Sequence, residues 1–235
     1  MMTCLAFGYA GSSDNAFSAL ASAWPDTLPL KQFVYPGRGS RQSEDFSTSL
    51  SQLAHEAVET LTDDQPVMLL GYSMGALVAF EAARQLQRQR RRVAALVVCA
   101  INAPHQQLPS RNVATFDLPA LTSYLAELGG TPPEILASQE LMAWFAPAIQ
   151  SDYRLLDGGV APGADRVNCP IIALSGQDDV LTTSAGMQAW RDCTSASFQS
   201  AVLPGGHFFL QQHPDALIST LFTLFPLPAV REISL

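Results

Sequence analysis

A serine between two glycines is the first candidate for chemistry in this chain. Residues 71–75 read Gly-Tyr-Ser-Met-Gly, a G-x-S-x-G pattern with Ser73 at its centre. The apolar residues 67–70 before it have the length of a buried strand, and residues 76–89 after it follow a helical pattern. A serine on a sharp turn between a strand and a helix is the arrangement of a nucleophile elbow. We therefore predict a nucleophile at Ser73, with an ordinary glycine-rich turn as the alternative.

The residues around the serine suit this chemistry. The turn would force Ser73 into a strained backbone conformation, and Gly71 and Gly75 would let neighbouring chain approach where a Cβ atom would clash. The helix that follows directs its positive N-terminal end at the place where negative charge develops during acyl transfer.

An acid and a histidine follow two later strands. A predicted strand at residues 198–203 leads into a glycine turn with His207, and another at residues 170–175 leads to Asp178 and Asp179. Because the carboxyl ends of parallel strands lie at one edge of a sheet, we expect these side chains to meet the serine there. The order serine, acid, histidine along the chain is that of an α/β-hydrolase.

Each member of this triad has a defined role. His207 would accept the proton of Ser73 as a general base and return it to the leaving group. Asp179 would hold the imidazole in the productive tautomer and stabilise the imidazolium. The neighbouring Asp178 is the competing acid, and spacing alone leaves both open.

A loop of small residues, 8–13, follows the first predicted strand. Such a loop can present backbone N–H groups, and the second donor of an oxyanion hole is the N–H of the residue after the nucleophile, here Met74. The alternative is an ordinary turn between a strand and a helix.

The remaining pattern predicts one α/β domain over residues 1–235, with a mostly parallel central sheet and flanking helices. The alternation of strands and helices stops after residue 100 and resumes near residue 170. Between them, residues 138–156 form a helical stretch that is apolar on two sides and contains Met142, Trp144 and Phe145. We interpret the insertion, at about residues 104–160, as a lid over an apolar pocket or as part of its wall. The predicted strands are 3–7, 30–35, 67–70, 94–100, 170–175 and 198–203, and the predicted helices are 15–24, about 50–61, 76–89, 117–128, 138–156, 184–191 and 214–225.

Composition excludes several classes of protein. The net charge of −8 argues against nucleic acid as a partner. No apolar window is long enough to span a membrane, and the first residues lack the features of a signal peptide. The four cysteines are scattered, without metal spacing or a paired framework, which indicates a reducing, cytoplasmic protein. Cys99 and Cys169 lie in or beside predicted strands, and we expect them to be buried thiols.

Six motifs follow one another along the chain: Phe7-Gly8-Tyr9-Ala10-Gly11, Tyr35-Pro36-Gly37-Arg38-Gly39-Ser40-Arg41, Gly71-Tyr72-Ser73-Met74-Gly75, Leu128-Gly129-Gly130-Thr131-Pro132, Ser151-Asp152-Tyr153 and Gly205-Gly206-His207. In this order they resemble the type II thioesterases, the external editing thioesterases of nonribosomal peptide and polyketide synthetases. The resemblance extends from residue 3 to about residue 225. The chain differs from the family at Gly8, where proline is usual, at Tyr72, where histidine is usual, and at Gln150, where arginine is common.

The resemblance implies an α/β-hydrolase fold with a helical lid and hydrolysis of acyl groups from the phosphopantetheine arm of acyl- or peptidyl-carrier proteins, with acyl-CoA as a small substrate. By matching motif, the triad is Ser73, Asp179 and His207, and the oxyanion donors are the N–H groups of Ala10 and Met74. The family needs no metal or redox cofactor, and we expect none. We expect a monomer. A carboxylesterase or lipase, an acyltransferase and a noncatalytic hydrolase-like protein remain the alternatives.

Two clusters of arginine are candidates to contact an acidic carrier protein. Residues 88–92 should lie at the sheet edge opposite the serine. Arg38 and Arg41 follow the carboxyl end of a predicted strand, and we expect them at the mouth of the pocket, although an exposed turn is the simpler interpretation of Arg38.

Overall fold

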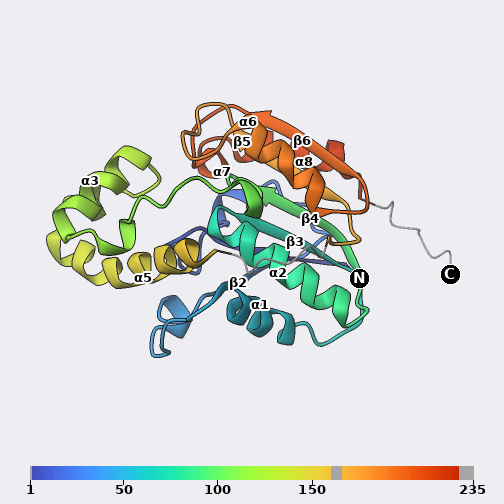
Figure 1. Ribbon diagram of the computed structural model, residues 1–235, viewed down its shortest axis with the longest axis horizontal. Helices are drawn as coiled ribbons and strands as arrows, with labels where there is room; N and C mark the ends of the chain where they lie inside the picture. The colour runs from blue at the N-terminus through green and yellow to red at the C-terminus, as the bar shows by residue number, and fades with distance from the viewer. Residues whose placement is uncertain (1, 160–165, 228–235) are drawn as a thin grey trace.

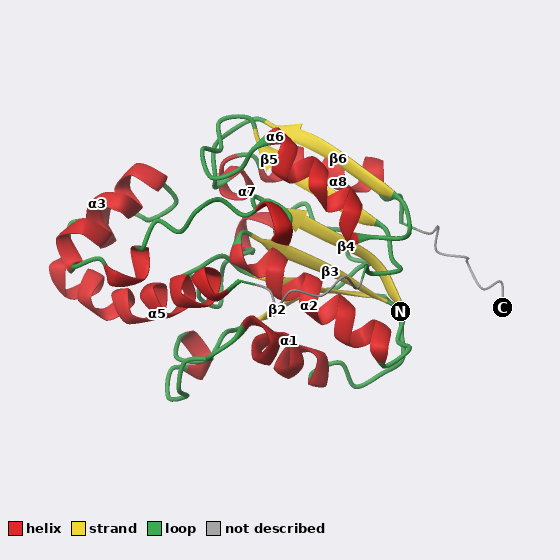
Figure 2. Cartoon of the chain, viewed as in Figure 1, coloured by secondary structure: helices red, strands yellow, loops and turns green. Residues whose placement is uncertain are grey.

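The computed structural model describes residues 2–159 and 166–227, and its centre is a six-stranded sheet (Figure 2). Neighbouring strands are all parallel, in the order β2-β1-β3-β4-β5-β6. The predicted parallel sheet is confirmed, and the predictions differ from the observed strands only at their ends. The strands are β1 (Thr3–Phe7), β2 (Leu30–Phe33), β3 (Val67–Tyr72), β4 (Val93–Cys99), β5 (Ile171–Gly176) and β6 (Phe198–Leu203).

Helices cover both faces of the sheet, which explains why its inner strands are apolar at consecutive residues. On β1, Leu5 and Phe7 belong to the core beneath α1 (Leu50–Glu59) and α2 (Met74–Arg88). Cys4 and Ala6 point to the other core, which contains residues of α8 (Pro214–Leu224). The shorter helices near these layers are α6 (Ser184–Gln188) and α7 (Phe209–Gln212).

A helical insertion separates β4 from β5 and extends away from the sheet (Figure 1). It contains α3 (Leu118–Leu128), α4 (Pro133–Leu136) and α5 (Gln139–Gly158). The predicted starts of the two longer helices are confirmed, because the Asp117 carboxylate accepts from the Ala120 N–H and the Ser138 hydroxyl from the Leu141 N–H. The insertion has a small core of its own, made of Val113, Leu121, Leu125, Met142, Ala146 and Ile149.

The helix predicted at residues 15–24 is wrong. Only Ser18–Leu20 form a short 3₁₀ helix, and the rest of the segment consists of turns. Most of its backbone hydrogen bonds join residues three apart, such as Ala21 N–H to Ser18 carbonyl, whereas the Trp24 N–H donates four residues back, to Leu20; Phe17, Leu20 and Trp24 are buried against the sheet. Packing of these side chains therefore overrides the helical pattern of the sequence.

Two glycines bring the elbow into contact with its neighbours, as the sequence indicates. A Cβ atom on Gly71 would overlap the backbone of Ala76 in α2. A Cβ atom on Gly75 would overlap the carbonyl oxygens of Phe7 and Gly8, at the end of β1. The start of α2 thus lies directly against the loop that leaves β1.

We expect Gly71→Ala to destabilise the protein, because the added methyl group meets backbone that cannot rotate away. Overpacking of this kind costs about 1–3 kcal/mol, and each kcal/mol lowers the Tm of a chain of this size by about 2–4 °C. Gly158→Ala is the matched control, since nothing lies within 4 Å of its Cβ position. Calorimetry that found equal Tm values for the two variants would contradict this account of the elbow.

Candidate active site

Ser73 occupies a strained turn between β3 and α2. Its backbone angles are φ 53° and ψ −124°, a region that residues other than glycine rarely adopt. The Ser73 N–H donates to the carbonyl of Cys99 at 2.8 Å, which ties the turn to the end of β4. The predicted strain at this serine is confirmed.

The structure brings Ser73, Asp179 and His207 together. His207 Nε2 lies 3.1 Å from Ser73 Oγ, and His207 Nδ1 lies 3.1 Å from each carboxylate oxygen of Asp179. All three residues are buried, whereas Asp178 is exposed. The hydrogen bonds run from carboxylate to imidazole to hydroxyl, which is the geometry that general-base activation of a serine requires.

The loops that carry the acid and the histidine support each other. The Asp178 N–H donates to the Gly205 carbonyl at 2.9 Å, and a Cβ atom on Gly176 would overlap the Gly206 carbonyl oxygen. The Asp179 carboxylate also accepts from the Leu181 N–H at 2.9 Å. The carboxylate is therefore fixed by its own loop as well as by the imidazole.

Tyr72 is a residue near the site whose role sequence reasoning did not find. Its side chain is fully buried, and its hydroxyl donates to the His207 carbonyl at 2.6 Å and accepts from the Leu210 N–H at 3.3 Å. Burial raises the pKa of this hydroxyl well above its usual range, so it stays a donor at every physiological pH. The signal in the sequence was its position next to the serine, where the family usually has histidine.

The two predicted oxyanion donors, Ala10 and Met74, belong to segments that contact each other, the loop after β1 and the start of α2. Ala10 lies in a turn closed by the Ser12 N–H and the Tyr9 carbonyl at 3.0 Å, with Gly11 at φ +80°. Met74 is the first residue of α2 and is buried. Because the start of α2 lies against this loop, the geometry is compatible with N–H groups from both segments facing one acyl oxygen.

A cavity of about 520 Å³ opens at Ser73 and His207. One part of its wall is polar and comes from the loop after β1 and from Gln211: Ser12, Ser13, Asn15, Ser18 and Gln211. The other part is apolar and comes from the insertion: Leu125, Leu128, Ile135, Met142, Phe145 and Ile149. Trp144, predicted with Met142 and Phe145 for the lid, is 71% exposed and does not line the cavity.

Arg38 is buried, whereas both interpretations of the sequence require it to be exposed. It is 8% exposed and forms an ion pair with Asp152 of α5, which is 1% exposed. The rings of Tyr35 and Phe46 lie beside its guanidinium, with ring centres 5.4 and 6.0 Å away. An acid more than a hundred residues away in the chain explains the burial, so Arg38 is not available to a partner.

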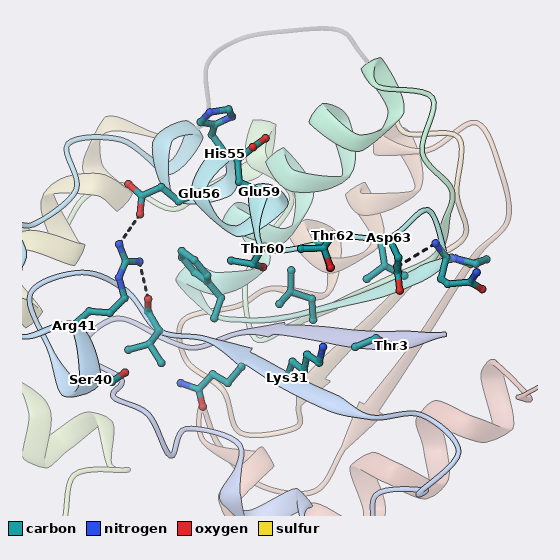
Figure 3. A pocket seen from close by; sticks show the side chains of 18 of the residues that line it. Thr3, Lys31, Ser40, Arg41, His55, Glu56, Glu59, Thr60, Thr62 and Asp63 are labelled. Atoms are coloured by element: carbon teal, nitrogen blue, oxygen red, sulfur yellow. Dashed lines mark hydrogen bonds and ion pairs between the residues drawn. The ribbon is translucent and has the colours of Figure 1, made fainter. Parts of the chain in front are cut away.

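Arg41 also has partners within the chain. It forms an ion pair with Glu44 and a second one with Glu56 at 2.9 Å. Figure 3 shows the pair with Glu56. It lines a second cavity, of about 830 Å³, between β2 and α1. This cavity is larger than the one at the serine but contains no residue of the predicted site, so its size does not make it the centre of the chemistry.

The cysteines offer no competing nucleophile. All four are buried free thiols, as predicted for Cys99 and Cys169. Burial raises the pKa of the Cys4 and Cys99 thiols, and raises that of Cys193 to about 11. Within residues 2–159 and 166–227, no group of acidic, histidine and cysteine side chains could hold a metal ion, and no helix is long and apolar enough to cross a bilayer.

The parallel sheet, the serine elbow and the helical insertion together define an α/β-hydrolase. The family model described as "Thioesterase domain" matches residues 3–225, and this chain belongs to that family.

Relatives agree with this assignment. The chain is 32% identical to the "Probable cadicidin biosynthesis thioesterase" of Streptomyces griseus, over 90% of this chain and 59% of that protein. It is 34% identical to the "Phenyloxazoline synthase MbtB" of Mycobacterium tuberculosis, over 91% of this chain but 15% of the synthase. It thus spans less than two thirds of the length of these curated relatives. The structure of the type II thioesterase BorB from the borrelidin biosynthetic cluster, 31% identical, superposes with a TM-score of 0.86 over 94% of this chain and 91% of that one.

We expect Asp179→Asn to be far more damaging than Asp178→Asn. An amide beside His207 Nδ1 can leave the imidazole in the wrong tautomer, which lowered turnover about 10⁴-fold in a well-studied serine protease. The rate at which a fluorophosphonate labels Ser73 measures this effect directly. Asp178→Asn is the matched control, because it makes the same change on the exposed neighbour. If both variants fold and the ranking is reversed, the acid is Asp178.

Proposed function

We propose that this chain is a type II thioesterase, which hydrolyses acyl thioesters from the phosphopantetheine arm of acyl- or peptidyl-carrier proteins. Its task is the removal of aberrant or stalled acyl groups in nonribosomal peptide or polyketide synthesis, with acyl-CoA as a small substrate. The observation that carries the proposal is the hydrogen-bonded Ser73, His207 and Asp179 at a cavity partly lined by apolar residues of the insertion. The similarity to the cadicidin biosynthesis thioesterase and to the type II thioesterase BorB supports the pathway class.

The reaction follows from the positions of these groups. His207 Nε2 takes the proton of Ser73 as the Oγ atom attacks the thioester carbonyl. The oxyanion that forms accepts hydrogen bonds from the N–H groups of Ala10 and Met74. Collapse of this intermediate breaks the C–S bond, and His207 returns the proton to the sulfur. Water then attacks the acyl-enzyme with His207 again as base, which releases the acid and restores Ser73.

The two parts of the cavity suit the two parts of the substrate. The acyl chain binds among the apolar side chains of α3 and α5, such as Leu125, Phe145 and Ile149. The amide-rich pantetheine arm lies along the polar side, near Ser13 and Gln211. Since one chain supplies the whole triad, we propose a monomer, and its free thiols fit the reducing cytoplasm.

We expect Ser73→Ala to abolish hydrolysis in a protein that still folds. Loss of a triad nucleophile lowers kcat about 10⁶-fold in a well-studied protease. The assay is a panel of acyl groups on carrier proteins, with the same groups on CoA and as p-nitrophenyl esters. Turnover of esters alone would favour a carboxylesterase, transfer to added amines or alcohols an acyltransferase, and no turnover a noncatalytic protein. Near wild-type turnover by Ser73→Ala would end the serine-hydrolase account.

We expect Phe145→Ala to shift preference towards longer or bulkier acyl groups, because it enlarges the apolar end of the cavity. Phe145 is only half-buried, so its loss should cost less than the roughly 3–5 kcal/mol of a buried phenylalanine. Trp144→Ala is the matched control, one residue away but outside the cavity. Chain-length profiles on acyl-CoA test both variants; an unchanged profile for Phe145→Ala would remove the insertion from substrate selection.

A further inference from the structure

One buried carboxylate on helix α5 contacts two other segments of the active-site region. Asp152 Oδ2 accepts from the Gly11 N–H at 2.7 Å. The Arg38 guanidinium donates to both oxygens of the same carboxylate, with Arg38 Nη2 at 2.8 Å from Oδ1. Asp152 thereby joins the insertion to the loop after β1 and to the turn after β2.

The loop that Asp152 contacts is the one that carries Ala10. Gly11 is the next residue, and it packs so closely on α5 that a Cβ atom there would contact Ile149 at 2.6 Å. On the other side of Ala10, the Tyr35 hydroxyl donates to the Gly8 carbonyl at 2.8 Å. The peptide groups of Ala10 are therefore held between two buried anchors.

We propose that Arg38 and Asp152 are positioning residues, which hold the loop of Ala10 so that its N–H points at the oxyanion. This inference rests on the proposed function, in which the Ala10 N–H is an oxyanion donor. Asp152 acts through Gly11, and Arg38 acts by neutralising and orienting Asp152.

The chemistry of the pair favours this role over one in stability alone. Burying two charges is costly, and apolar residues of similar volume often give equal or greater stability. Moreover, Arg38 Nε finds no acceptor among the described residues. Burial raises the pKa of the Asp152 carboxyl, while Arg38 and the Gly11 N–H act in the opposite direction, so the carboxylate depends on these two donors.

The proposal couples the acyl pocket to the oxyanion. Ile149 and Tyr153 of α5 line the cavity on either side of Asp152 in the sequence. An acyl group that packs well against α5 therefore braces the helix that holds the loop. Discrimination among acyl groups should consequently appear more in kcat than in KM.

The test is the steady-state hydrolysis of an acyl-CoA by Asp152→Asn, with kcat expressed per site that a fluorophosphonate can label. We expect kcat to fall about 10–100-fold, less than the about 10²–10³-fold for removal of an oxyanion donor, while KM changes less than about twofold. The double variant Arg38→Gln/Asp152→Asn should recover part of kcat, because it no longer leaves an unpaired guanidinium. Glu81→Gln is the matched control: Glu81 is also buried and pairs with Arg84 at 3.0 Å, but both residues lie on α2 rather than on this loop.

A trifluoromethyl ketone analogue of the acyl group separates positioning from a purely structural role, because it forms an oxyanion on Ser73. Its affinity should fall by the same factor as kcat, while the affinity of a non-reacting thioether analogue stays constant. Constant kcat per labelled site, or an equal loss in Glu81→Gln, would overturn the proposal. If Asp152→Asn does not fold, Tyr35→Phe, which removes only the hydroxyl at the Gly8 carbonyl, must lower kcat at constant KM; unchanged kcat there also overturns it.

The same variants are also compared on a p-nitrophenyl ester. If the wild-type protein cleaves esters but not thioesters, the proposed function fails, yet the ratios between variants still report on the oxyanion loop. If the wild-type protein hydrolyses thioesters normally and all the variants have the same kcat, only the positioning role fails.

Discussion

The backbone of Ser73 is the constraint on which the rest of the site depends. A serine at φ 53° is strained by about 1–3 kcal/mol, and the surrounding packing must supply this energy. Gly71 and Gly75 allow that packing, because each lies where a Cβ atom would overlap a neighbouring backbone. The contact that holds Ser73 in this conformation is also the contact that places the loop of Ala10 beside the start of α2.

Strand β3 contributes to both sides of the reaction. Its last residue, Tyr72, donates to the His207 carbonyl, and the next residue is Ser73, the proposed nucleophile. His207 is thus held near Ser73 by the Tyr72 hydroxyl as well as by the direct hydrogen bond of 3.1 Å between Nε2 and Oγ. Because the strands are parallel, the loops after β3, β5 and β6 reach the same edge, and short loops suffice to bring the three residues together.

Local signals in the sequence predicted most of the fold. Helix caps such as Asp117, and apolar runs bounded by glycine or proline, depend on neighbours a few residues away. The elbow and the order of acid and histidine predicted which residues meet. The turns at residues 15–24 were missed because tertiary packing sets them. Arg38 was misjudged because arginine is usually exposed, and nothing near it in the sequence shows that Asp152 will cover it.

Helix α5 connects parts of the molecule that its sequence alone could not connect. It begins in the core of the insertion, with Met142, and Leu155 near its end belongs to the core beneath α1 and α2. Asp152 lies between these two anchors and reaches the loop of Ala10. A well-packed core responds to misfit by shifting whole elements rather than by yielding locally. If Ala10 donates to the oxyanion as we propose, an acyl group that misfits the insertion acts on this loop through α5, and one helix then serves both selection and catalysis.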